Sequence, residues 1–145
     1  MDTLRSLLVQ NQTNLDRLRA RVRYLHRLIS TTDFDTHKQY GPYAEFWDEW
    51  QELAASILSD ARSDVGATME FIDELRDFIY YAEAQTNKRK SKVFEKRCAE
   101  MDELAREALV CQRDMLHMAD TRIAEHREFT DKLHLVEAID SLNED

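Results

Sequence analysis

Apolar residues recur along the chain at alternating intervals of three and four, the spacing of a helix with one apolar face. The pattern is unbroken in residues 4–29, so this segment is expected to form a long amphipathic helix. Its seam consists of Leu4, Leu8, Asn11, Leu15, Leu18, Val22, Leu25 and Ile29. The polar member, Asn11, has two interpretations: a buried amide that sets helix register, or a residue near a frayed end that contacts water.

A second helix is expected from Pro42, because proline lacks an N–H and its φ angle suits a first helical turn. Its apolar positions continue to Ala82, and the fourfold spacing of Ala61, Val65 and Met69 departs from the strict pattern. Gly66 leaves open a break in this helix, since glycine in a helix interior costs about 1 kcal/mol relative to alanine.

A third helix follows the run QTNKRKSK, which interrupts the apolar positions and predicts a chain reversal between residues 85 and 92. Three polar residues, Gln112, Arg122 and His126, fall on its apolar seam. This helix is therefore expected to be partly exposed or to be covered by another subunit. The apolar members are Phe94, Cys98, Met101, Ala105, Ala108, Met115, Ala119, Phe129, Leu133 and Val136.

The sequence thus predicts one all-α domain, residues 1–145, with three long antiparallel helices at 3–30, 42–86 and 90–142, packed as a coiled coil. A break near Gly66 would give four helices. A first helix of about 28 residues spans about 42 Å and a second of about 44 spans about 66 Å, so the first cannot cover the others. Either the longer hairpin projects, or it folds back, or a second chain covers it; homodimerisation is the most economical arrangement.

Charge separates the helices. Residues 1–30 hold six Arg and two Asp, whereas residues 31–86 hold three basic and thirteen acidic residues. Pairing of a basic first helix with an acidic second one is electrostatically favourable. The arginines also resemble those of amphipathic helices that lie on anionic membranes, which gives an alternative, membrane-acting function. Nucleic acid is not an expected partner at a net charge of −9.

The sequence contains little that predicts catalysis. Asp114 with His117 and Asp131 with His134 have the spacing of metal ligands, but the two pairs lie about 25 Å apart on one helix and cannot bind one metal centre. Two glycines in 145 residues are too few for a phosphate-binding loop. We therefore expect no enzyme activity, no metal and no cofactor.

Cys98 and Cys111 lie about 20 Å apart on the same predicted helix and cannot form a disulfide with each other. This favours a reducing, cytoplasmic setting. No apolar run approaches the roughly 20 residues of a membrane span. The basic patch has two interpretations, a solvated helix junction or a signal for nuclear import, and consists of Lys88, Arg89, Lys90 and Lys92.

The function predicted from these features is non-catalytic: a scaffold, adaptor or oligomerisation module that binds a protein partner. Two groups of residues are candidates for the interface. The first is the start of the first helix, with Leu4, Leu8, Asn11, Leu15 and Leu18. The second is an aromatic group that either closes one end of the bundle or anchors a partner, because Trp and Tyr dominate binding hot spots; its members are Tyr43, Phe46, Trp47 and Trp50.

Overall fold

The computed structural model describes residues 1–31, 44–85 and 91–143, which contain three helices and no strand. The helices are α1 (Asp2–Thr31), α2 (Ala44–Ala84) and α3 (Lys92–Asn143). The predicted all-α fold of three helices is confirmed. The predicted helix ends differ by one or two residues from those observed, and the predicted ends at 42, 86 and 90 lie outside the described residues.

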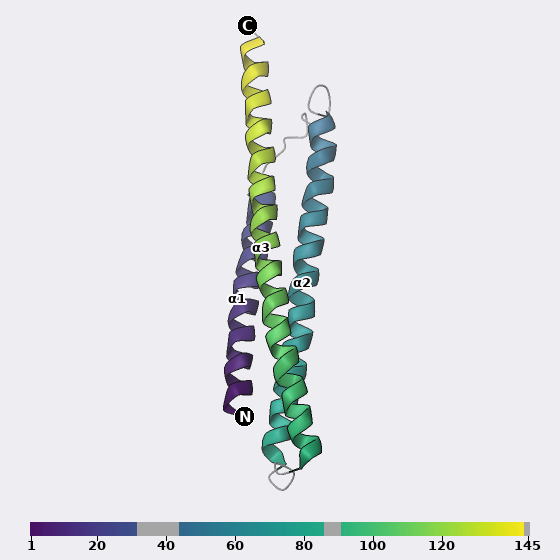
Figure 1. The fold of residues 1–145 in the computed structure, drawn as a ribbon. Coiled ribbons are helices and arrows are strands. Elements are labelled where there is room, and N and C mark those ends of the chain that lie inside the picture. Colours follow the sequence, from purple (N-terminus) through teal and green to yellow (C-terminus); the bar gives the residue numbers. More distant parts are fainter. Residues whose placement is uncertain (32–43, 86–90, 144–145) are drawn as a thin grey trace.

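The three helices pack side by side as an elongated bundle in which successive helices run in opposite directions (Figure 1). Hydrogen-bonded residues of α1 and α3 lie between 94 and 103 positions apart, as expected for parallel helices in a nearly constant register. Between α1 and α2 the order reverses. Arg5 contacts Glu83, whereas Arg19, fourteen residues later, contacts Met69, fourteen residues earlier.

The second helix continues through Gly66 without a break, so the four-helix alternative is wrong. Gly66 is exposed, and a Cβ atom at this position would meet nothing within 4 Å. The glycine therefore neither ends the helix nor permits a close approach of another element. The unequal helix lengths are instead accommodated by projection, because the 52 residues of α3 extend past the end of the 30-residue α1 (Figure 1).

The start of α3 has a clear local cause. The Ser91 hydroxyl accepts a hydrogen bond from the backbone N–H of Phe94 at 3.5 Å, and the Ser91 carbonyl accepts one from Glu95 at 3.0 Å. Ser91 is thus the N-cap residue, which satisfies an N–H group that the first helical turn leaves without an intrahelical partner.

The apolar core has two parts at different heights along the bundle. Leu4, Leu7 and Leu75 belong to a cluster near the start of α1, and Leu25 with Ile57 belongs to a cluster near its end. The residues that separate these clusters include buried polar side chains, namely Asn11, Thr68 and Gln112. The middle of the bundle therefore contains buried polar groups, which neither cluster includes.

Two buried residues were missed by the sequence pattern. Leu7 is more deeply buried than its neighbour Leu8, because α1 contacts two helices and buries a wider stripe than one heptad seam. On α2, Thr68 is buried while the predicted core residue Met69 is exposed. The Thr68 hydroxyl donates to the Asp64 carbonyl at 2.9 Å, which satisfies its donor inside the bundle.

The bundle itself covers the polar residues on the seam of α3. Gln112 and His126 are buried, and only 15% of the Arg122 side chain is exposed. Arg122 reaches α2, where it forms ion pairs with Asp64 at 3.5 Å and Asp60 at 3.7 Å. Cover from a second subunit is therefore not needed at these three positions.

Candidate functional site

A chain of side-chain amides crosses from the surface to the centre of the bundle between α1 and α3. Asn14 Nδ2 donates to Gln112 Oε1 at 2.9 Å, and Gln112 Nε2 donates to Asn11 Oδ1 at 2.5 Å. Asn11 Nδ2 in turn donates to the carbonyls of Leu7 at 2.8 Å and Ala105 at 3.4 Å. Asn11 is 0% exposed and Gln112 is 2% exposed, so of its two interpretations Asn11 is the buried amide.

The role of this amide chain is to fix the alignment of α3 along α1, not to carry out a reaction. A shift of α3 along α1 by one residue would separate Gln112 from Asn11 and leave two buried amides without partners. A single buried polar residue of this kind fixes helix register in coiled coils. The amide chain therefore determines which surfaces α1 and α3 present, and its two inner members, Asn11 and Gln112, are buried.

One accessible apolar surface lies between α2 and α3 and includes no residue of α1. A groove of about 260 Å³ runs between these two helices, which we call the α2–α3 groove. Leu104 on its wall is 48% exposed, and Cys111 is exposed as well. Its lining is Ala67, Thr68, Phe71, Leu104, Glu107, Ala108, Cys111, Gln112 and Met115. Met118, one turn beyond Met115, is 45% exposed and extends this apolar surface along α3.

Carboxylates border the α2–α3 groove on both helices. On α3, Glu107 lines the groove, and Glu100 and Asp114 lie one heptad before and after it on the same side of the helix. On α2, Glu70 and Glu74 each follow a groove residue by three positions. All five are exposed. The groove thus combines an apolar floor with an acidic rim.

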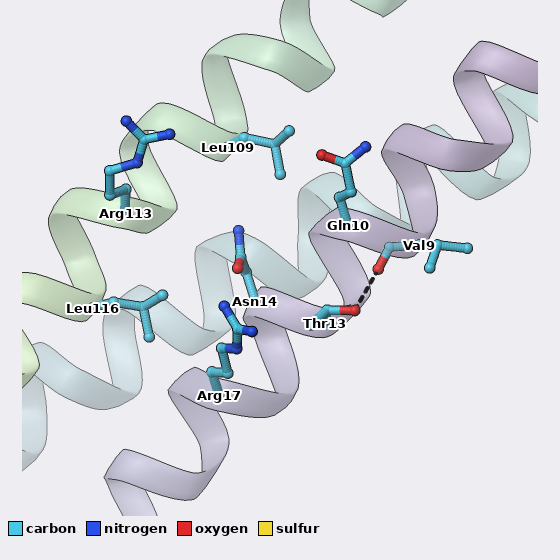
Figure 2. Close-up of a pocket in the computed structure, with 8 residues that line it drawn as sticks. All are labelled: Val9, Gln10, Thr13, Asn14, Arg17, Leu109, Arg113 and Leu116. Carbon is cyan, nitrogen blue, oxygen red and sulfur yellow. Dashed lines mark hydrogen bonds between the residues drawn. The ribbon is translucent and has the colours of Figure 1, made fainter.

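A second groove, between α1 and α3, has a different character (Figure 2). Leu109 and Leu116 of α3 extend toward α1, while arginines lie on both walls, Arg17 on α1 and Arg113 on α3. The Thr13 hydroxyl, also in its lining, donates to the Val9 carbonyl at 2.9 Å. This α1–α3 groove has a volume of about 400 Å³ and is basic where the α2–α3 groove is acidic.

The predicted interface on α1 lies inside the bundle. Leu4, Asn11, Leu15 and Leu18 are buried against the other helices of the same chain, and Leu8 is half-buried. In this fold no partner can reach the first four without separating α1 from the bundle. The strict heptad pattern of α1 therefore reports contacts within the chain.

Most side chains of the predicted aromatic group and of the basic patch lie outside the part of the chain that the structure describes. Tyr43 lies outside the described residues, as do Lys88, Arg89 and Lys90 of the basic patch. Phe46, Trp47 and Trp50 belong to the first turns of α2, but their side chains lie outside the described part. Lys92 is the first residue of α3 and is exposed.

Two titratable side chains have altered proton affinity. Burial lowers the pKa of His126 below the ordinary histidine value, and burial raises the pKa of the Cys98 thiol. Both cysteines are free thiols. Within the described ranges no three His, Cys, Asp or Glu side chains gather as a metal site would require, and no helix there is long and apolar enough to span a membrane.

The sequence pattern did not single out the α2–α3 groove. Leu104 and Cys111 lie off the seam of α3, and Phe71 lies beside the seam of α2. The only sequence signal was the presence of apolar residues next to the seam on two helices. These residues can be assigned to one groove only when the register of the two helices is known.

Comparison with known proteins gives no relative: no protein-family model, curated protein or solved structure matches the chain.

Proposed function

We propose that this protein is a non-catalytic interaction module, an elongated helical scaffold that binds a protein partner along the α2–α3 groove. The observation that carries this proposal is the exposure of apolar side chains in a groove between two long helices, above all Leu104 and Met118. Exposed apolar surface bordered by polar residues is typical of protein-binding sites. We expect the protein to act as a coiled-coil homodimer in the cytoplasm. Two free thiols are in keeping with that compartment.

The burial of α1 weighs against the membrane-acting alternative. For α1 to lie on a bilayer, its apolar face would have to leave the bundle, including Leu7, Leu18 and Leu25, each less than 4% exposed. Burial of a leucine side chain contributes about 1.5–3 kcal/mol, so separation of this helix would cost much of a typical domain stability. Binding of a partner to the groove requires no such opening.

The proposal is tested by a charged substitution in the groove. Leu104→Glu places a carboxylate on the groove wall, while Val110→Glu makes the same change on an exposed position of α3 outside the groove lining. Both sites are about half exposed, so both variants should fold, which circular dichroism checks. A partner captured from native lysate by the wild-type chain should be lost with Leu104→Glu and retained with Val110→Glu.

Equal capture by both variants, or capture of nothing by the wild-type chain, would contradict the proposed function. Light scattering on the three purified proteins measures self-association separately. A dimer that persists in Leu104→Glu would show that the chain self-associates through another surface.

A further inference from the structure

We infer that the occupant of the α2–α3 groove is a single amphipathic helix of a partner protein, with lysine or arginine residues flanking its apolar stripe. This inference rests on the proposed function and specifies the partner's chemistry. It follows from the shape of the groove, its apolar floor and the charge of its rim.

The shape favours a helix. The groove lies between two long helices, and three helices of a bundle leave a position that a fourth can occupy, with its side chains packed between those of its neighbours. An amphipathic helix buries one apolar stripe in such a groove and keeps its polar face in water. The partly exposed side chains of Phe71, Leu104 and Met115 would be covered by this stripe.

The acidic rim favours a partner helix with positively charged flanking residues. A helix in the groove presents its flanking positions to carboxylates on both sides, Glu74 on α2 and Glu107 on α3, with Glu70, Glu100 and Asp114 along the same edges. Glu100 has Lys96 at 4.0 Å on its own helix, and no cation lines the groove itself. Arg122, farther along the interface, is already paired with Asp60 and Asp64. Flanking cations would therefore meet carboxylates on both walls of the groove.

The same charges disfavour a second copy in this position. A symmetric dimer through the groove would bring the acidic rim of one chain against the acidic rim of the other, and like charges across an interface are unfavourable. The basic α1–α3 groove of another copy would match in charge, but two different surfaces that bind head to tail build rings or open chains rather than a symmetric dimer. A cationic helix from a partner avoids both problems.

The test is a selection from a library of helical peptides. Each peptide has about 21 residues, three heptads, with leucine at the two core positions and Lys, Gln or Glu allowed at the flanking positions. Peptides are selected on the full-length wild-type protein and counter-selected on Leu104→Glu, which retains only those that need the groove. We expect lysine to be enriched several-fold over glutamate at the flanking positions.

A second selection uses Glu74→Lys/Glu107→Lys, which reverses charge on both sides of the groove while both positions are exposed. Here the preference for lysine should disappear. A selected lysine-flanked peptide should bind this variant about tenfold more weakly than wild type, because each exposed pair contributes modestly and reversal adds repulsion. Its binding to Val110→Glu should not weaken.

A thiol footprint locates the bound peptide. In Cys98→Ser, Cys111 is the single remaining cysteine and lies in the groove lining. A peptide in the groove should slow alkylation of Cys111 several-fold at saturation. An unchanged rate would mean that the peptide binds elsewhere, and the inference would fail.

The outcomes separate the inference from the proposed function. Groove-dependent peptides with neutral or acidic flanks would overturn the cationic partner but leave a groove that binds helices. A lysate partner whose binding is lost with Leu104→Glu but is unchanged by Glu74→Lys/Glu107→Lys would also overturn the cationic partner and leave the groove as a binding site. Absence of any groove-dependent peptide, or a dimer abolished by Leu104→Glu, would overturn the inference by showing that no such helix, or a second copy, is the occupant.

Discussion

Gln112 Nε2 donates a hydrogen bond of 2.5 Å to Asn11 Oδ1, which joins two buried amides whose residues lie 101 positions apart. Each amide satisfies the other in a place that water does not reach. The pair therefore ties the register of α3 to that of α1.

Loss of one member should cost more than loss of both. Gln112→Leu leaves Asn11 Oδ1 buried without this donor and should lower the free energy of unfolding by about 1–3 kcal/mol. Asn11→Leu/Gln112→Leu removes both polar groups and should recover most of that loss. Urea unfolding of the wild type, both single variants and the double variant gives the coupling energy. Additive losses would show that the two amides do not depend on each other.

Stability should fall in mild acid because of His126. Burial lowers its pKa in the folded state, so the unfolded chain binds more protons between that lowered pKa and the ordinary value near 6.5. The stability that depends on neutral His126 is therefore fully present above about pH 6.5 and is lost as the pH falls toward the folded-state pKa. His126→Leu should reduce the difference in unfolding free energy between pH 7.5 and pH 5. An undiminished difference in His126→Leu would show that other groups cause the pH dependence.

Gly66→Ala should stabilise the protein by about 0.5–1 kcal/mol, because alanine loses less backbone entropy in a helix and its Cβ meets no neighbouring atom. Ala55→Gly, at another exposed position of α2, should destabilise by a similar amount. Thermal unfolding of both variants measures the two effects. A loss of stability in Gly66→Ala would mean that α2 needs flexibility at this point.

Arg122→Met should weaken the contact between α2 and α3. The variant keeps an unbranched apolar stem but removes the charge that faces Asp60 and Asp64, and we expect a loss of about 1 kcal/mol that shrinks in 1 M salt. Arg106→Met removes an exposed pair with Asp102 within one helix and should cost less. Equal losses, unaffected by salt, would assign the effect of Arg122 to packing.

The two thiols should react at different rates. Cys111 is exposed, whereas Cys98 is half-buried and burial raises its pKa, so less of it is the reactive thiolate near neutral pH. Alkylation of the native protein followed by peptide mass analysis should find Cys111 modified first. Faster modification of Cys98 would indicate that the end of the bundle near Met1 opens readily.

The alternation of apolar residues by three and four was enough to establish three helices and their approximate ends, because this periodicity is a property of each segment alone. It also placed Leu15, Leu18 and Leu25 in the core. The same local information could not choose between burial and exposure for Asn11. It also predicted Met69 rather than Thr68 as the core residue.

Those choices depend on contacts between segments far apart in the chain. Asn11 is buried because Gln112 lies beside it, and Thr68 is buried because α2 turns this face toward α3, where Met115 lies at 3.6 Å. The α2–α3 groove has the same origin, since α1 covers one side of both longer helices and leaves the other open. Helix formation was thus determined by the sequence pattern, whereas the relative register of three rods, and with it the accessible surface, was decided only by tertiary packing.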